Sequence, residues 1–222
     1  MFTYGARVSG AVVIFDLDGT VWDSAPGILA CLRSTLDVLS LPVPSDEGLR
    51  AVLGPPILSA LTQLGVPDVR LDEARALYRA AYRDRGERDA TVYDGIVPLL
   101  DGLRTAGVTL ATATSKGRDP AVRMLQHFGL ADRFDLIAAE PMGAVNHTKI
   151  DVIADAIRQA GDPDPGDVTM IGDRAFDVEG GNHFGCRTIG VRWGYAQPGE
   201  LEAASPSDIA TTVAGLEGLL LS

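Results

Sequence analysis

Lysine is scarce in this sequence: only Lys116 and Lys149 occur, against seventeen arginines in 222 residues. Cysteine is scarce too, and Cys31 and Cys186 lie far apart in the chain. Two distant cysteines argue against the disulfide framework of a small secreted domain. The N-terminal stretch "MFTYGARVSG" lacks the apolar segment of a signal peptide, so we expect a cytoplasmic protein.

Long apolar runs are also missing, and none approaches the length of a membrane span. The formal net charge is -11, which repels nucleic acid and anionic membrane surfaces at long range. We therefore expect neither nucleic acid nor membrane as a partner. An anionic small-molecule substrate would need a metal ion or a few well-placed cations in its binding site.

Short apolar runs rich in Val, Ile and Phe are what the chain does contain, and helical patterns separate most of them. Such runs are typical of buried parallel strands in βα units. The expected strands span residues 12–15, 108–113, 134–138, 168–171 and 188–191. The sequence therefore predicts an α/β fold, with a Rossmann-like parallel sheet and helices on both faces.

Helix start signals accompany these strands. Asp119-Pro120 predicts a helix start, residues 149–160 form an amphipathic pattern that stops at Gly161, and Ser207-Asp208 predicts the cap of a final helix.

Roughly seventy residues separate the first strand from the next, more than a βα connection needs. Their pattern is helical, with Ser24 and Ser45 as candidate N-caps. We therefore expect residues 24–91 to form a helical cap domain. It would be inserted into a discontinuous catalytic core of residues 1–23 and 92–222.

The first strand runs directly into two aspartates in "VVIFDLDGTVWDS". Asp16 and Asp18 should share one side of the strand end, at the sheet edge where open α/β folds bind ligands. Two close carboxylates require a divalent cation such as Mg²⁺, or a proton that would make one of them a general acid. The alternative is a plain hairpin turn at Asp18-Gly19.

A second apolar strand ends in carboxylates in "VTMIGDRAFDVEGG", which places Asp173 and Asp177 at the same edge. Either aspartate could instead be a simple helix N-cap. Gly180 and Gly181 follow inside the expected helix, where glycine is unfavourable, so a close packing contact is expected there.

A third strand ends in Thr114, Ser115 and Lys116, whose hydroxyls and backbone N–H groups could hold phosphate oxygens. An ordinary polar loop is the alternative. Lys149 stands in a first helical turn, where its charge opposes the helix dipole. That unfavourable placement indicates a functional point charge rather than a solvated lysine.

These segments, in this order, resemble the haloacid dehalogenase superfamily of phosphohydrolases. "DLDGT" and "IGDRAFD" carry the resemblance, which covers essentially the whole chain and includes the helical cap. It implies a Rossmann-like core, a Mg²⁺ cofactor and an aspartyl-phosphate intermediate.

The resemblance also implies a role for each site residue. Asp16 matches the nucleophile and a metal ligand. Asp18 matches the general acid/base, with its backbone carbonyl on the metal. Thr114 matches the phosphoryl-binding hydroxyl, with Ser115 beside it, and Lys149 the lysine that steadies the phosphoryl oxygens. Asp173 matches the acidic metal ligand, and Asp177 its supporting acid.

Several branches of this family can be compared with the residues of this sequence. A dehalogenase is disfavoured by the presence of Asp18, Asp173 and Asp177, and a phosphonate-cleaving enzyme is disfavoured because the expected cap contains no lysine. The stretch "LGPPILS" is mostly apolar, which makes a β-phosphoglucomutase-like enzyme less favoured. The closest resemblance is to phosphoglycolate phosphatase and its 5′-nucleotidase relatives.

Three matters stay open at this stage. Arg50 is a candidate for a second charge of the substrate, although a solvated helix arginine is the more common case. A catalytically silent phosphate-binding protein is the alternative from another functional class. We expect a small phosphorylated metabolite as partner, and either a monomer or a homodimer.

Overall fold

The protein is built on one parallel six-stranded sheet. The computed structural model describes residues 10–142 and 147–221. The strand order is β5-β4-β1-β6-β7-β8, and every neighbouring pair is parallel. The strands are β1 (Val12–Phe15), β4 (Thr109–Gly117), β5 (Leu136–Glu140), β6 (Val168–Gly172), β7 (Arg187–Val191) and β8 (Asp208–Ala210).

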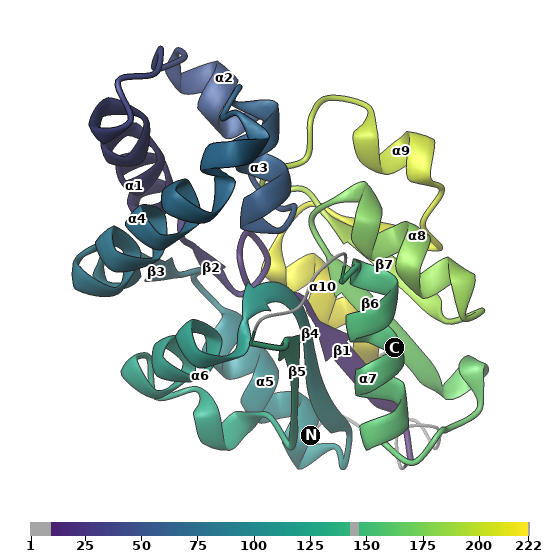
Figure 1. Cartoon of the computed structure of the whole chain (residues 1–222). Helices are drawn as coiled ribbons and strands as arrows, with labels where there is room; N and C mark the ends of the chain where they lie inside the picture. The colour runs from purple at the N-terminus through teal and green to yellow at the C-terminus, as the bar shows by residue number, and fades with distance from the viewer. Residues whose placement is uncertain (1–9, 143–146, 222) are drawn as a thin grey trace.

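Helices cover both faces of this sheet, and the buried strand β1 contributes to both layers (Figure 1). Val13 and Phe15 join the core shared with α5 and α6, whereas Val12 and Ile14 join the core shared with α7. The helices of the core domain are α5 (Ile96–Thr105), α6 (Arg118–His127), α7 (Lys149–Gln159), α8 (Ala175–His183), α9 (Glu200–Ala204) and α10 (Val213–Leu221). The predicted α/β fold class is confirmed.

A helical insert, the segment between β2 and β3, lies apart from the sheet (Figure 1). Its helices are α1 (Ala25–Val38), α2 (Asp46–Arg50), α3 (Ile57–Gln63) and α4 (Leu71–Asp84). β2 (Trp22–Asp23) and β3 (Thr91–Val92) pair as a short antiparallel ribbon at its base. The two chain crossings thus lie side by side, and the exact domain boundaries stay a prediction.

Two predicted helix starts are wrong. α6 begins at Arg118, before the expected Asp119-Pro120 cap. Asp208 belongs to β8, where Arg187 pairs with its carboxylate, and the final helix starts later because Thr212 caps it by accepting from the Gly215 N–H. The α7 prediction is confirmed: Thr148 forms a capping box with Asp151, and the helix ends before Gly161.

Both cysteines are buried and free. Within the described residues, no helix combines the length and apolarity that crossing a membrane requires. Residues 1–9 of the N-terminal stretch on which the absence of a signal peptide was predicted lie outside the described residues.

The two glycines of α8 allow close packing, as their unfavourable position in a helix indicated. A Cβ on Gly180 would meet Ile153 of α7 at 2.6 Å, and one on Gly181 would meet the Thr188 methyl of β7 at 2.5 Å. Thr188 cannot rotate away without cost, because its hydroxyl bonds to Asn182 and to the Ser207 N–H. Small residues therefore let α8 lie against the sheet and against α7.

We predict that Gly181→Ala lowers the free energy of unfolding by about 1–3 kcal/mol, because the added methyl group overpacks this contact. The measurement is urea denaturation. Gly102→Ala in α5 is the matched control: a Cβ there meets nothing within 4 Å, so alanine should stabilise by about 0.5–1 kcal/mol. Equal effects of the two substitutions would contradict the packing argument.

Candidate active site

Three carboxylates from distant parts of the chain meet at the carboxyl edge of the sheet. Asp16 follows β1, Asp173 follows β6, and Asp177 lies in the first turn of α8. All three are buried, and each offers an oxygen within 4.8 Å of the others. Gly172 lets the Asp177 carboxyl approach, since a Cβ on Gly172 would overlap it.

Lys149 is buried at the start of α7 and joins two of these carboxylates. Its Nζ lies 2.6 Å from Asp16 Oδ1 and 2.7 Å from Asp177 Oδ1, and it donates to the Ala113 carbonyl at 2.7 Å. Although burial disfavours its charge, the two aspartates raise the pKa of the Lys149 ammonium above its usual value. A first-turn lysine is thus stabilised by tertiary contacts that outweigh the helix dipole.

The carboxylates remain in excess over this one cation. Burial raises the pKa of Asp16 to about 7, with Asp177 and Asp18 adding to the rise and Lys149 opposing it. Burial, and then Asp177 and Asp16, raise the pKa of Asp173 well above its usual value. The cluster therefore favours uptake of a positive charge, either a proton or a metal ion.

The donor set fits Mg²⁺. Carboxylate oxygens are the ligands this ion prefers, and three buried carboxylates with one lysine leave a net negative charge. Thr20 Oγ1 and the Tyr195 N–H each donate to Asp173, at 3.1 and 2.7 Å, and so hold its carboxylate in place. Gly19 and Gly194 pack directly on Asp173, where a Cβ would overlap it.

We expected the proximity of Asp16 to keep Asp18 protonated, but the structure shows a different arrangement of the Asp18 carboxylate. Its carboxylate is turned to Lys116, 2.8 Å from Nζ, and accepts hydrogen bonds from Trp22 Nε1 at 2.7 Å and Ser24 Oγ at 2.6 Å. Burial disfavours its charged form, yet Lys116 and these donors hold the pKa of Asp18 below its usual value. In this arrangement Asp18 is a carboxylate.

The hairpin alternative for the Asp18-Gly19 segment is wrong, because in the described part of the chain β1 pairs only with the parallel strands β4 and β6, and β2 pairs with β3. A tight turn does form, since the Gly19 N–H donates to the Trp22 carbonyl and the Trp22 N–H donates back to Leu17. Ser24 precedes α1 as predicted, but its hydroxyl bonds Asp18 instead of capping the helix. Ser45 does cap α2, by accepting from the Gly48 N–H.

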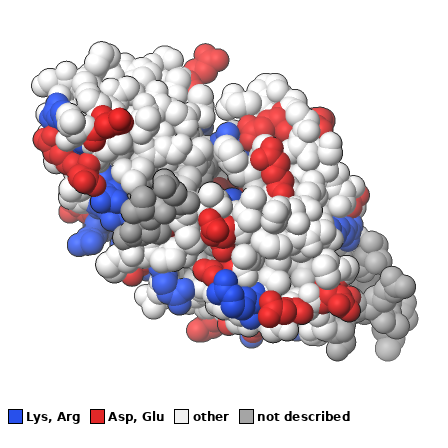
Figure 2. Space-filling view, turned by 45° about the vertical axis from the view of Figure 1, so that its right-hand side comes forward, with Lys and Arg blue, Asp and Glu red and all other residues white. Residues whose placement is uncertain are grey.

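A cavity of about 260 Å³ opens between this cluster and the helical insert. Asp16, Asp18, Thr114, Ser115 and Lys116 line its floor. Thr114 is buried and its hydroxyl accepts from the Lys116 N–H at 3.2 Å, within the last residues of β4. Acidic side chains, with basic ones among them, are spread over the surface in Figure 2, as the net charge requires.

The structure does not bring Arg50 to this cavity. Arg50 is exposed at the end of α2 and is not among the described residues that line the cavity. The arginines that do line it are Arg79 and Arg83 of α4 with Arg118 and Arg123 of α6. Arg50 is therefore a poor candidate for a second charge of the substrate.

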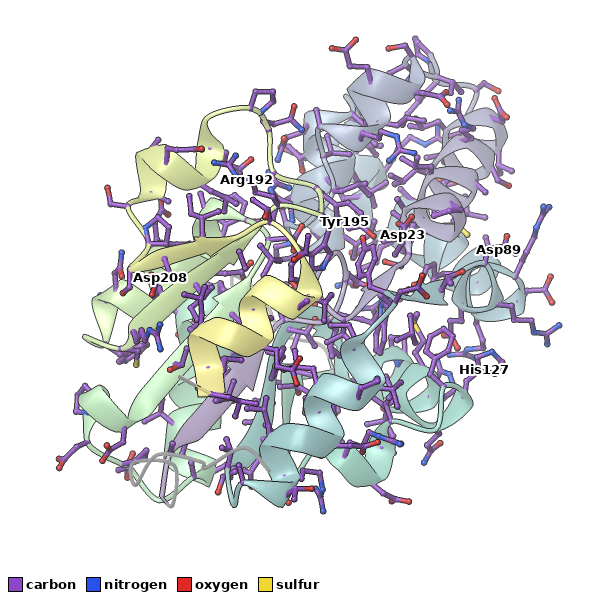
Figure 3. All side chains as sticks on the ribbon, turned by 180° about the vertical axis from the view of Figure 1, so that it is seen from behind. Asp23, Asp89, His127, Arg192, Tyr195 and Asp208 are labelled. Atoms are coloured by element: carbon purple, nitrogen blue, oxygen red, sulfur yellow. The ribbon has the colours of Figure 1, made fainter. Side chains whose placement is uncertain are left out.

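For two residues of the site the sequence predicted no role of the side chain. Lys116 forms an ion pair with Asp18. The scarcity of lysine in the sequence was a signal for such a role, because the only two lysines of the chain both pair with aspartates of the site. Tyr195 had no such signal. Its hydroxyl donates to Asp23 at 3.0 Å and accepts from the Ser24 and Ala25 N–H groups, and Figure 3 shows Tyr195 beside Asp23.

Tyr195 thereby connects two parts of the molecule. Its N–H bonds the carboxylate of Asp173, and its buried hydroxyl bonds the backbone where the chain passes from β2 into α1. The base of the helical insert is in this way held against the carboxylate cluster.

Comparison with known proteins agrees with this geometry. The family model of haloacid dehalogenase-like hydrolases matches residues 13–191, a range that includes the whole cluster. The chain belongs to this family. The hydrolase type that the sequence predicts is confirmed with it, and phosphatases among its relatives and structural neighbours support a phosphatase.

Two curated relatives cover nearly all of this chain. It is 40% identical to a tyrosine-protein kinase, PtkA, of Mycobacterium tuberculosis, over 95% of this chain and 72% of the kinase. It is 32% identical to a 5′-nucleotidase of Pseudomonas aeruginosa, over 95% of each. A crystal structure of a predicted phosphatase from Clostridium acetobutylicum superimposes with a TM-score of 0.89 at 33% identity, covering 95% of this chain and 98% of that one.

We predict that the chelator-treated protein loses stability as pH rises from about 4 to 7. The folded state binds a proton at Asp16 up to about pH 7, whereas the unfolded chain releases it near 4, so the free energy of unfolding falls with rising pH throughout this window. Thermal unfolding in EDTA measures the effect. Mg²⁺ should raise the melting temperature, most strongly above pH 7, because it replaces the proton.

Asp16→Asn should flatten this pH dependence, since the amide does not titrate. Asp119→Asn, an exposed acid at the rim of the same cavity, is the matched control and should leave it unchanged. A wild-type protein whose stability is constant across the window would contradict the assigned charge excess.

Proposed function

We propose that this protein is a magnesium-dependent phosphomonoesterase that hydrolyses a small phosphate ester through an aspartyl-phosphate on Asp16. The observation that carries the proposal is the buried cluster of Asp16, Asp173 and Asp177, in which Lys149 pairs with Asp16 and Asp177 and Asp16 lines a cavity of small-molecule size. A structural or silent binding protein has no need for so costly an excess of buried carboxylates.

Asp16 is the proposed nucleophile, because it lines the cavity while Asp173 is held by Thr20 and Tyr195. Its carboxylate oxygen attacks phosphorus and the alcohol leaves; water then hydrolyses the acyl phosphate. Mg²⁺, when bound by Asp16, Asp173 and the backbone carbonyl of Asp18, would offset charge on the phosphoryl group. Asp177 supports the cluster by its pairing with Lys149.

Lys149 and the strand end of β4 complete the phosphoryl site in this proposal. The Lys149 ammonium fixes Asp16 and offers its charge to phosphoryl oxygens. The hydroxyls of Thr114 and Ser115, which line the same floor, bind those oxygens.

Asp18 is the proposed general acid/base. It protonates the leaving alkoxide and then deprotonates the attacking water. Since Asp18 is ionised against Lys116 in this structure, the first step requires that the pair separates as the substrate binds and that Asp18 takes up a proton from solvent. A phosphate ester carries the negative charge that can draw the Lys116 ammonium away.

The resemblance of the sequence suggests phosphoglycolate and, as the alternative, 5′-mononucleotides as substrates. A phosphomutase is less favoured. We further propose a cytoplasmic protein, monomeric or homodimeric, whose partner is a phosphorylated metabolite and not a nucleic acid or a membrane.

We predict that Asp16→Asn lowers kcat by at least about a thousandfold on any ester the wild type hydrolyses, because the amide cannot form the acyl phosphate. Phosphate release is measured on phosphoglycolate, 5′-mononucleotides and sugar phosphates, with Mg²⁺ and with EDTA. Asp119→Asn is the control. Turnover that survives in EDTA or in Asp16→Asn would refute the mechanism.

We also predict that Lys116→Met extends activity to higher pH. Removing the ammonium raises the pKa of Asp18, so Asp18 stays protonated, and able to donate, at higher pH. The falling limb of kcat/KM against pH, which reports the free enzyme, should shift upward. Lys116→Arg keeps the charge and should keep the limb; equal limbs in all three proteins would contradict the role of Asp18.

A second candidate function is transfer of phosphate to tyrosine, because a relative 40% identical over 95% of this chain is named a tyrosine-protein kinase. Incubation with ATP, Mg²⁺ and a tyrosine-containing peptide distinguishes the two. Phosphorylation of the peptide without ester hydrolysis would favour the kinase, and ester hydrolysis without phosphorylation of the peptide would favour the phosphatase.

A further inference from the structure

Most of the residues that the helical insert contributes to the cavity lining are apolar, and its charged residues there are Arg79, Arg83 and Glu87. The apolar wall comprises Ile28 and Leu32 of α1, Val52 and Leu53 of the turn after α2, and Ile57 and Ala60 of α3. Two tyrosines of α4, Tyr78 and Tyr82, complete it with stacked rings whose centroids lie 5.6 Å apart.

This wall faces the position of the leaving alcohol. The Lys116 ammonium lies 2.8 Å from Asp18 Oδ2 and 2.8 Å from the Tyr82 hydroxyl, and 4.5 Å from the centroid of the Tyr82 ring. The tyrosine pair is therefore one ammonium group away from the carboxyl that would protonate the leaving oxygen. The carbon skeleton attached to that oxygen must extend toward the tyrosines and the aliphatic wall.

The insert offers few partners for hydroxyl groups of a substrate. Among its described residues, no Ser, Thr, Asn, Gln, Asp or His side chain lines the cavity. Its polar side chains there are the two tyrosines, the exposed Arg79 and Arg83, and Glu87, which is paired with Arg123. The Tyr82 hydroxyl already accepts from Lys116 and donates to the Met124 sulfur. Sugar hydroxyls placed against this wall would lose their hydrogen bonds to water without replacement.

The cavity is lined by both basic and acidic side chains, so these charges do not favour a substrate of one particular charge. Arg79, Arg83 and Arg118 lie there with Asp119 and Glu140, and Arg123 is paired with Glu87 at 2.6 Å. Selection beyond the phosphoryl group therefore depends on the apolar wall.

We propose that the substrate is a phosphate monoester whose alcohol carries an aromatic or aliphatic body directly beside the phosphate, in preference to phosphoglycolate or a sugar phosphate. The inference rests on the proposed phosphatase function and names its substrate class. Burial of the body against the insert supplies the binding energy, and the aromatic rings of Tyr78 and Tyr82 suit a flat ring.

The first test compares esters of primary alcohols whose leaving groups are chemically alike: ethyl, propyl, butyl and benzyl phosphate, with phosphoglycolate and glucose 6-phosphate. We expect kcat/KM to rise about threefold per methylene, and benzyl phosphate to exceed phosphoglycolate at least about tenfold. A flat series, or a preference for phosphoglycolate, would overturn the proposal.

A substitution in the wall tests its location. Ile57→Asn places an amide in the half-buried wall and should reduce kcat/KM for benzyl phosphate about tenfold while sparing ethyl phosphate. Val69→Asn, at a position of the same insert that is 95% exposed, is the matched control and should change neither value. Equal losses on both esters in Ile57→Asn would contradict a role in selecting the alcohol.

Binding of unreactive analogues separates this inference from the phosphatase proposal. Benzylphosphonate and methylphosphonate differ in the body and not in the phosphoryl group, and their affinities for the intact protein with Mg²⁺ are measured by calorimetry. Tighter binding of benzylphosphonate, lost in Ile57→Asn, supports the apolar site even if no ester is hydrolysed. Equal affinities overturn the inference even if the protein proves to be a phosphatase.

Discussion

The burial of three carboxylates around one ammonium group is the interaction on which the site depends. Asp16, Asp173 and Asp177 repel one another away from water, and Lys149 offsets part of that repulsion. Their excess charge favours the uptake of a positive charge, which a proton or a divalent cation could supply. The cluster stands at the one edge of the sheet where the ends of β1 and β6 lie side by side.

A second buried ion pair, between Lys116 and Asp18, neutralises the neighbouring aspartate and connects it to the helical insert. Lys116 pairs with Asp18 and with the Tyr82 hydroxyl of α4, while Tyr195 ties Asp173 to the start of α1. Core and insert therefore meet through polar contacts at the floor of the cavity and through apolar residues at its wall. In the function that we propose, the core carries out the chemistry and the insert selects the alcohol.

The predictions that succeeded rest on strong local signals. β1 and the start of β6 were placed to the residue because buried central strands are continuous apolar runs. β8 was missed because it is a short edge strand, whose Asp208 reads as a helix cap until Arg187 is seen beside it. Ser24 was predicted to cap a helix because its tertiary partner was likewise hidden: the sequence does not show that the Ser24 hydroxyl donates to Asp18.

The sequence by itself determined the fold class, the helical insert and the identity of the acidic and basic residues at the strand ends. Only the tertiary structure decided which groups pair. Lys149 reaches Asp16 across 133 positions of the chain, and Asp18 turns to Lys116 instead of sharing a proton with Asp16. The tertiary structure also placed Arg50 away from the lining of the cavity and brought together the apolar residues of its wall. The physical reason is that charge pairing and burial depend on distances between elements, which local periodicity and propensity do not encode.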